Sequence, residues 1–458
     1  MIHHLKSAVQ SRLMRAILVG AYGQGIQIGL QLLGVPVMIA MWGTASYGVW
    51  LALYLVPSYL VMADFGLTTA AANDMAMKMT RGEVNDTRRV FQALRVLVGV
   101  VTGSLLLIFV GCIYGPGAHW LDFAQKATQG HAQITTLLLM VYGLTALSNG
   151  TVNAGYRAVD RFALGGTIFQ TVFLFESAML LAAVAMGASM MEAAAVIMAI
   201  RIIGSLITTV WLRTHFGWLF ARKEPVSLAQ LKRLLRPAMG SMALPFANVT
   251  ALQGPILLIT SVVGSVWVPM FTTARTLTRF PLQLTLVMSS ATVTRFSVAH
   301  AAHHQAQKAR LLLVNLAVAA GLLIPAAAGV MVLGQWLIRH WTRGAIEVDM
   351  RLLGLLTAAM LANGTWTMLS NFLIAINKQD LFAYTYAALA AGMFFLGKML
   401  APAMGVVGIG VSVLMADLAM LGWLIVLVAR LRIVDPVEFR AQMQAALAYV
   451  SRAKGAAQ

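Results

Sequence analysis

The stretch QLLGVPVMIAMWGTASYGVW, residues 31–50, ends one apolar run, makes a short turn and begins the next apolar run. Similar runs recur along the whole chain, and a helix of about 20 apolar residues is long enough to cross ~30 Å of hydrocarbon. The composition agrees, because 60% of the 458 residues are hydrophobic and only 10% are charged. The sequence therefore predicts an all-α integral membrane protein that crosses the bilayer many times.

Twelve transmembrane helices fit the pattern of apolar runs and short polar turns. We place them at residues 16–41, 47–71, 92–114, 134–156, 164–186, 190–212, 238–262, 266–290, 309–334, 351–376, 382–402 and 407–430. The loops between these spans are short, so no large domain is expected outside the membrane.

The Lys and Arg residues predict how the chain is oriented. With the N-terminus in the cytoplasm, most of the 33 basic residues fall in cytoplasmic segments, and the opposite loops hold only Lys126, Arg339, Arg343 and Arg351. Cytoplasmic loops of membrane proteins carry such an excess of positive charge, so both termini are predicted to be cytoplasmic. These loops, facing anionic lipid, also explain the net charge of +18, and nucleic acid is not expected as a partner.

Three short patterns occur twice in the same order. LLGVP at 32–36 matches LQGP at 252–255, Gly43 with Trp50 matches Gly264 with Trp267, and SNGT at 148–151 matches ANGT at 362–365. This repeat predicts two six-helix bundles, residues 1–225 and 226–458. Because six is an even number, the two bundles have parallel orientations in the membrane. In transporters of this type the substrate path lies between the halves.

The first 80 residues carry a family resemblance. A Gly-rich first span leads into WGTASYGVW, with Tyr47-Gly48 opening the second span, and then into ADFGLTTAAANDMA, where Asp64–Leu67 closes it. With ARTLTR in the eighth span, this pattern resembles the bacterial O-antigen/polysaccharide flippase family. That family belongs to a superfamily that also holds the multidrug and toxic-compound extruders and the lipid II flippases.

The resemblance implies a function as a flippase in the bacterial inner membrane. Its substrate would be an undecaprenyl-pyrophosphate-linked oligosaccharide, moved from the cytoplasmic to the periplasmic face for O-antigen, capsule or exopolysaccharide synthesis. The implied partners are this lipid-linked oligosaccharide, membrane lipid, and the polysaccharide polymerase and chain-length proteins.

Three arginines lie near the middle of predicted spans. The stretch FTTARTLTRFPLQL, residues 271–284, places Arg275 and Arg279 four residues apart on one helix face. Charged residues at this depth face a bundle interior or an aqueous cavity, and two guanidiniums suit a pyrophosphate group. Arg201 is a third candidate for substrate binding. Pairing with buried acids, with Glu176 as the partner of Arg201, is the alternative.

Two acids, Glu176 and Asp417, also lie deep in predicted spans. A buried carboxyl group can bind and release a proton, as an ion-coupled exporter requires, so both are candidates for ion coupling; a buried salt bridge is the competing interpretation. Asp64 lies at the inner end of the second span, where we expect a structural turn or a gate.

Polar amide side chains form stripes on helices that the repeat relates. Gln24, Gln27 and Gln31 share one face of the first span, and Asn248 and Gln253 lie on the seventh. They are candidates to line a cavity and contact sugar hydroxyls, as are the repeat-related Asn149 and Asn363. Hydrogen bonding between helices is the alternative for all of them.

Two other functions stay open at this point. A cation-coupled multidrug antiporter of the same superfamily favours an acidic cavity, whereas the mid-membrane charges here are mostly basic. A membrane enzyme of glycan assembly requires paired acids near the outer surface, and the outer loops are too small to position them. The sequence contains no P-loop, zincin motif or cysteine-based metal site, so a non-enzymatic protein without a cofactor or metal is predicted.

Overall fold

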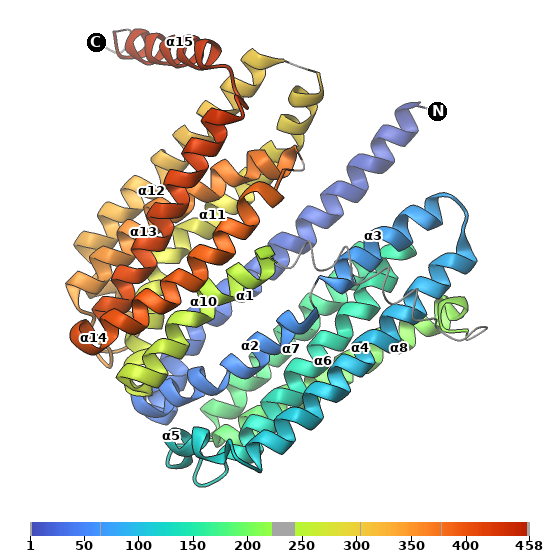
Figure 1. Ribbon diagram of the computed structural model, residues 1–458, viewed down its shortest axis with the longest axis vertical. Coiled ribbons are helices and arrows are strands. Elements are labelled where there is room, and N and C mark those ends of the chain that lie inside the picture. The colour runs from blue at the N-terminus through green and yellow to red at the C-terminus, as the bar shows by residue number, and fades with distance from the viewer. Residues whose placement is uncertain (1, 65, 222–242, 303, 377, 456–458) are drawn as a thin grey trace. The chain divides into compact units, whose positions relative to one another are not determined.

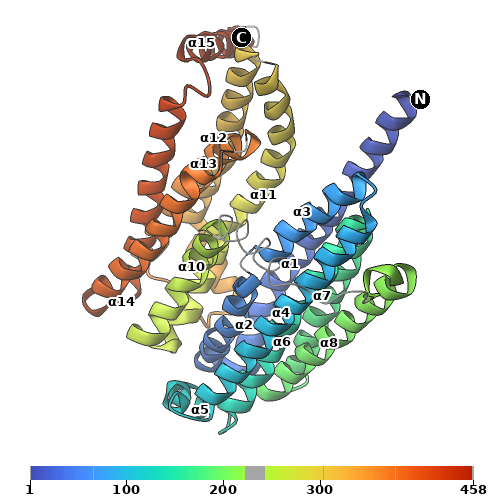
Figure 2. The same ribbon diagram turned by 45° about the vertical axis from the view of Figure 1, so that its right-hand side comes forward.

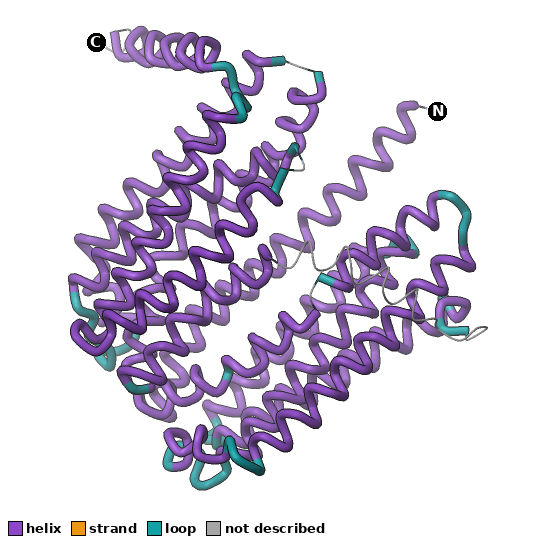
Figure 3. Tube along the Cα trace, in the orientation of Figure 1, coloured by secondary structure: helices purple, strands orange, loops and turns teal. Residues whose placement is uncertain are grey.

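The computed structural model describes residues 2–64, 66–221, 243–302, 304–376 and 378–455, and every regular element in these ranges is a helix (Figures 1 and 3). The elements are α1 (Ile2–Leu53), α2 (Leu55–Leu60), η1 (Val61–Asp64), α3 (Leu67–Thr80), α4 (Val84–Ile113), η2 (Ala118–Leu121), α5 (Asp122–Gln125), α6 (Ala132–Ala158), α7 (Phe162–Ala185), α8 (Met190–His215), η3 (Gly217–Leu219), α10 (Ala243–Leu258), η4 (Ile259–Val263), η5 (Ser265–Trp267), α11 (Val268–Ala301), α12 (Gln305–Trp341), α13 (Met350–Ala375), α14 (Asp380–Arg430) and α15 (Pro436–Gly455).

Each of the twelve predicted spans overlaps a helix of this set. Among the described residues, nine helical segments are long and apolar enough to cross a membrane. Two of these segments each hold a pair of predicted spans, because the backbone leaves the helical region at Gly43 in α1 and at Gly405 in α14. The remaining predicted span lies in α11, which is less apolar because it contains Arg275 and Arg279.

The repeat seen in the sequence has a counterpart in the backbone. Gly43 has φ 79° and ψ 162°, and its repeat partner Gly264 has φ 116° and ψ 143°. Only glycine adopts such angles without strain, so both residues make the tight reversal between consecutive spans. The equivalence of the two turns is therefore a consequence of the same local residue requirement.

The described chain forms two compact units. The first contains Met1–Pro269 and Trp341–Ala345, and the second contains Met270–His340 and Ile346–Gln458. In this division α10 belongs to the first unit. The predicted boundary between residues 225 and 226, and the amphipathic segment expected at 227–236, lie outside the described residues, so the division into 1–225 and 226–458 stays a prediction.

The most enclosed helices are α6 in the first unit and α13 in the second. In the most apolar stretch of each helix, 56% of the residues of α6 and 61% of those of α13 are buried. The corresponding share is 11% to 33% in the other candidate spans. Helix α6 packs against α2, α3, α4, α7 and α8 (Figures 1 and 2). The repeated motifs SNGT and ANGT therefore lie on the two central helices.

Small residues on α6 allow this close packing, as is general in membrane helix bundles. A Cβ added to Gly143 would lie 2.7 Å from the Cα of Pro57, which is backbone and cannot turn away. We expect Gly143→Ala to lower stability by about 1–3 kcal/mol through overpacking. Thermal unfolding of the protein in detergent micelles measures this loss.

Gly99→Ala is the control for the glycine prediction. Gly99 lies on α4, where an added Cβ meets nothing within 4 Å. Because alanine favours helix over glycine by up to about 1 kcal/mol, this variant should melt at the same temperature as the unmodified protein or higher. Equal melting temperatures for the two variants would show that the α2–α6 contact is not tight.

Candidate functional site

A cavity of about 490 Å³ lies in the first unit between α1, α2, α6, α7 and α8. Its polar lining includes amide, hydroxyl and guanidinium groups, contributed by Gln24, Gln27, Tyr54, Ser58, Gln170 and Arg201. Aromatic rings, among them Phe169 and Phe173, complete the wall. The cavity therefore combines hydrogen-bonding groups with apolar surface, as binding sites for small organic molecules do.

Arg201 and Glu176 form a buried ion pair at the cavity wall. Nη2 of Arg201 on α8 lies 2.6 Å from Oε2 of Glu176 on α7, and the two side chains are only 5% and 3% exposed. The pairing that the sequence suggested from their shared depth is present. A buried pair of this kind stabilises each charge only while both partners remain.

Two tyrosines extend this pair into a network. The Tyr142 hydroxyl accepts a hydrogen bond from Nη2 of Arg201 at 2.6 Å and from the Tyr54 hydroxyl at 3.2 Å, and it donates to Oε2 of Glu176 at 3.4 Å. The guanidinium also lies over the Tyr142 ring, 4.6 Å from its centroid. Tyr142 therefore fixes both the position and the tilt of the Arg201 side chain.

The network does not use every polar atom of the ion pair. Within the described part of the chain, Oε1 of Glu176 and Nε of Arg201 are buried without a hydrogen-bond partner. Buried polar atoms in this state are uncommon and call for an explanation, such as a bound water or ligand. The pair therefore retains hydrogen-bonding capacity beside the cavity.

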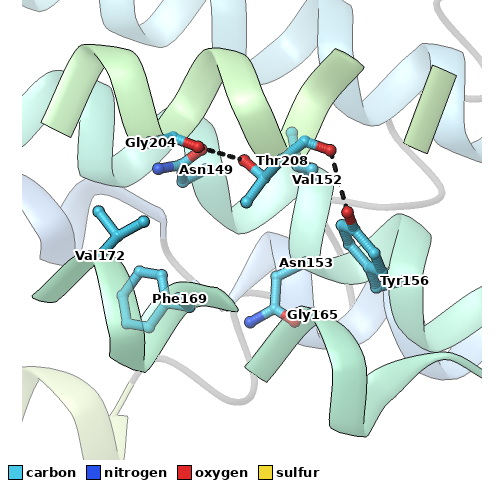
Figure 4. A pocket seen from close by; sticks show the side chains of 9 residues that line it. All are labelled: Asn149, Val152, Asn153, Tyr156, Gly165, Phe169, Val172, Gly204 and Thr208. Atoms are coloured by element: carbon cyan, nitrogen blue, oxygen red, sulfur yellow. Dashed lines mark hydrogen bonds between the residues drawn. The ribbon is translucent and has the colours of Figure 1, made fainter. Parts of the chain in front are cut away.

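Asn149 lies in a second, narrower pocket between α6, α7 and α8 (Figure 4). Its Oδ1 accepts a hydrogen bond from the Ser205 hydroxyl at 2.7 Å. Figure 4 shows Tyr156 at the other end of the pocket, where its hydroxyl donates to the Thr208 carbonyl at 3.1 Å. Phe169 lines this pocket and the larger cavity, so one ring borders both spaces.

Asp417 is the centre of a polar cluster in the second unit. Its Oδ1 accepts hydrogen bonds from Nδ2 of Asn363 at 2.8 Å and from Nε1 of Trp366 at 2.9 Å, both on α13. The Tyr386 ring lies 5.0 Å from the Trp366 ring. Arg279 on α11 interacts electrostatically with the Asp417 carboxylate. The cluster therefore joins α11, α13 and α14 within one unit.

The repeat relates one hydrogen bond in each unit. Asn149 on α6 bonds to Ser205 on α8, whereas the repeat-related Asn363 on α13 bonds to Asp417 on α14. The asparagines therefore have an interhelical bonding role in both units, which is one of the two interpretations the sequence left open. The partner differs, because the first unit uses a neutral hydroxyl and the second a carboxylate.

The two arginines of α11 belong to the second unit and do not line the cavity of the first. Arg275 lies over the Phe271 ring at 5.3 Å from its centroid, and it interacts electrostatically with Arg279 one turn away. The structure thus places Arg275 and Arg279 on one helix face, with Asp417 near the second of them.

The other predicted site residues have local roles or lie apart from the cavity. Oδ1 and Oδ2 of Asp64 accept hydrogen bonds from the backbone N–H and hydroxyl of Thr68, at 3.1 and 2.6 Å, at the start of α3. Gln31 and Gln253 are half-buried, Asn248 is exposed, and none of the three is among the residues that line the cavity. Their predicted functions, including a gate at Asp64, stay predictions.

Sequence reasoning missed the aromatic members of both clusters, namely Tyr54, Tyr142, Phe169, Trp366 and Tyr386. Their signal was weak, because a single aromatic residue in an apolar helix is usually part of the core. In the first unit, hydroxyls placed beside the Arg201–Glu176 pair distinguish Tyr54 and Tyr142 from core residues.

Comparisons with known proteins identify the fold of this chain. No protein-family model and no curated protein matches the chain. The inward-facing conformation of a multidrug resistance MATE family transporter of the MOP superfamily is similar, with a TM-score of 0.66 and 15% identity over 88% of this chain and 94% of that chain. A variant of the Vibrio cholerae MATE transporter VcmN has a TM-score of 0.60 and 14% identity over 94% and 99% of the two chains.

A third similar structure is a MOP superfamily transporter from Pyrococcus furiosus. Its TM-score is 0.59, with 15% identity over 92% of this chain and 95% of that chain, and reverse polarity of its binding pocket is described as suggesting a different function. This chain therefore has the MATE transporter fold, an all-helical membrane fold of twelve spanning helices in two bundles.

Proposed function

We propose that this protein is a secondary transporter that moves an amphipathic organic substrate across the membrane by alternating access. The proposal rests on the cavity of the first unit, which lies among apolar helices and is lined by Arg201, whose ion-pair partner Glu176 is buried behind it. Charged residues inside a membrane protein mark substrate or ion pathways. The fold shared with solved transporters agrees with this assignment.

Multidrug antiport is the first candidate activity. The similar solved structures include a multidrug resistance transporter, and this likeness favours antiport over the flippase that the sequence resemblance implied. The aromatic rings of Tyr54, Tyr142 and Phe169 provide apolar faces for a drug-sized molecule. Glu176 and Asp417, one in each unit, are the carboxylates proposed to exchange the coupling ion.

The lipid-linked oligosaccharide flippase is the second candidate, and the arginines favour it. Arg275 and Arg279 share a helix face in the second unit, and Arg201 is the charged residue in the lining of the first unit's cavity. Three amides and a serine in that lining match the hydroxyls of a sugar better than they match a cation. A similar fold whose binding pocket has reverse polarity is already known in the MOP superfamily transporter from Pyrococcus furiosus.

Transport by purified protein in liposomes separates these candidates. An imposed pH gradient should drive ethidium across the membrane if the protein is a drug antiporter. A fluorescent undecaprenyl-pyrophosphate-linked trisaccharide should reach the opposite leaflet if it is a flippase. Movement of neither probe, from protein shown to be folded by size-exclusion chromatography, would overturn the proposed function.

A cavity variant tests whether the transported probe uses this site. Gln27→Leu removes an amide from the lining, and the half-saturating concentration of the transported probe is expected to rise up to about tenfold, the value of one hydrogen bond to the substrate. Gln335→Leu, an exposed glutamine on α12 that is not among the residues lining the cavity, is the control and should leave transport unchanged. Equal kinetics for Gln27→Leu and the unmodified protein would place the substrate elsewhere.

A further inference from the structure

Pro36 leaves one carbonyl group of α1 without its usual partner. In a helix the N–H of residue 36 would donate to the carbonyl of Leu32, but proline has no N–H. Leu32 is 44% exposed, so this carbonyl is also accessible from outside the helix. The motif LLGVP therefore creates an acceptor on the surface of α1.

The Trp341 side chain supplies a hydrogen-bond donor for the Leu32 carbonyl. Its indole N–H donates to the Leu32 carbonyl at 2.7 Å, although the two residues are 309 positions apart in the sequence. Trp341 ends α12 and begins the short segment Trp341–Ala345, which belongs to the first unit. The hydrogen bond thus ties this segment to α1 beside Pro36.

A second contact joins α1 to the reversal that follows α10. Gly48 lies just beyond the Gly43 turn, and a Cβ at this position would overlap the Ser265 carbonyl oxygen and lie 3.0 Å from Cδ of Pro269. Ser265 begins η5 directly after the Gly264 turn. The two repeat-related turns are therefore held together by backbone at a position that accepts only glycine.

Both contacts are of a kind that can be broken and made again. When the Trp341 bond opens, water can satisfy the Leu32 carbonyl, and an indole is favourably placed at the membrane interface. The Gly48 contact is backbone against backbone and interlocks no large side chains. Permanent packing would instead interdigitate apolar side chains, as the buried residues around Phe91 and Leu94 do in the same unit.

The cavity and the two contacts lie at different positions along α1. The α1 residues that line the cavity, from Gly20 to Gln27, all precede Leu32 in the chain. The two contacts lie further along, toward and beyond Gly43. Both contacts therefore lie on the Gly43 side of the cavity's α1 residues.

A row of aromatic rings connects the closed end to the cavity. Trp50, two residues beyond Gly48, lies 6.1 Å from Tyr54, and Tyr54 lies 6.1 Å from Tyr142, measured between ring centroids. The Tyr142 hydroxyl in turn accepts a hydrogen bond from the Arg201 guanidinium. We therefore expect a shift of the α1 segment after Gly43 to reach the buried ion pair through these neighbouring rings.

We propose that the Trp341–Leu32 hydrogen bond and the Gly48–Ser265 contact form a releasable clasp that closes the Gly43 end of the first unit during one half of the transport cycle. The clasp opens when the cavity is exposed at the opposite face. This inference rests on the proposed transport function, because a clasp of this kind serves alternating access.

Cysteine labelling tests the clasp without any substrate. The chain has a single cysteine, so Cys112→Ser gives a cysteine-free background into which Ser58→Cys places a reporter in the cavity wall. A membrane-impermeant maleimide is applied from each side of the membrane. With the clasp intact, the reporter should react faster from the side of the N-terminus.

Variants of the clasp should move this preference. Trp341→Phe keeps the ring and removes the N–H, and Pro36→Ala gives the Leu32 carbonyl an N–H within its own helix. Each is expected to increase labelling from the Gly43 side at least threefold. Because both act on the same hydrogen bond, the double variant should show no further increase.

Matched controls lie on the same helices. Trp336→Phe alters an exposed tryptophan of α12, and Gly29→Ala adds a Cβ that meets nothing within 4 Å; neither should move the labelling preference, whereas Gly48→Ala should. Trp341→Phe decides the question even if Gly48→Ala fails to fold. Unchanged labelling in both Trp341→Phe and Pro36→Ala overturns the clasp.

The clasp and the transport function can fail separately. Shifted labelling in a protein that moves neither ethidium nor the lipid-linked trisaccharide would keep the clasp and reject transport of these substrates. Unshifted labelling in a protein that transports either probe would keep the proposed function and reject the clasp.

Discussion

Replacing Arg201 with methionine is expected to destabilise the folded protein by about 3–5 kcal/mol, because Glu176 then remains as a buried charge without its partner. The Arg201 and Glu176 side chains are 5% and 3% exposed, so water cannot replace the lost interaction. The measurement is the melting temperature in detergent, together with the yield of monodisperse protein. A low yield of folded protein is itself an expected result.

An exposed ion pair with the same nitrogen–oxygen distance is the matched control for Arg201→Met. Nη2 of Arg339 lies 2.6 Å from Oε1 of Glu347, but these side chains are 63% and 69% exposed. Because exposed ion pairs contribute only about 0–1 kcal/mol, Arg339→Met should leave the melting temperature almost unchanged. Equal losses in the two variants would contradict the argument from burial.

Removing both charges separates stability from transport. Arg201→Met combined with Glu176→Met leaves no unpaired charge, and apolar replacement of a buried pair is often neutral or stabilising. This double variant should therefore recover most of the stability that Arg201→Met loses. If the pair lies on the transport path, the stable double variant should nevertheless show no transport above the background of empty liposomes.

Asp417→Asn is expected to abolish pH-driven transport while the protein remains folded. The asparagine side chain keeps an Oδ1 that accepts the bonds from Asn363 and Trp366, so the geometry of the cluster is retained. Only the charge and the ability to exchange a proton are lost. Accumulation of the transported substrate against its gradient should fall to the level of empty liposomes.

Substrate exchange without a pH gradient is the internal check. If Asp417 acts in ion coupling, Asp417→Asn should still exchange labelled for unlabelled substrate, because that step uses no coupling ion. Ser205→Ala is the control in the first unit, since it breaks the repeat-related hydrogen bond to Asn149 without changing any charge. Normal pH-driven accumulation by Asp417→Asn would assign coupling to another group.

The helices were predictable because the signals that define them are local. Bilayer thickness sets the length of an apolar run, and Gly43 and Gly405 mark reversals that few other residues permit. Pairing of Arg201 with Glu176 could also be anticipated, because a charge in a membrane helix requires a partner at similar depth.

The composition of the two polar clusters could not be read from the chain. Whether Tyr142 faces Arg201 or lipid depends on how α6 and α8 rotate about their axes, and a mid-span tyrosine fits either case. The same holds for Trp366 and Asp417, which come from different helices. Apolar periodicity carries little information here, because membrane helices are apolar on almost every face.

The number of spans, their reversals and the residues that need a partner in the membrane follow from hydropathy and backbone freedom along a single helix, so the amino-acid sequence is enough to predict them. Which polar groups meet becomes clear only in the folded protein, where Tyr142 bonds to Arg201, Asp417 to Asn363, and Trp341 to the carbonyl that Pro36 leaves without its helical partner. Contacts between helices depend on the rotation of each helix about its axis and on its depth in the membrane, and the same apolar pattern is compatible with several choices of both.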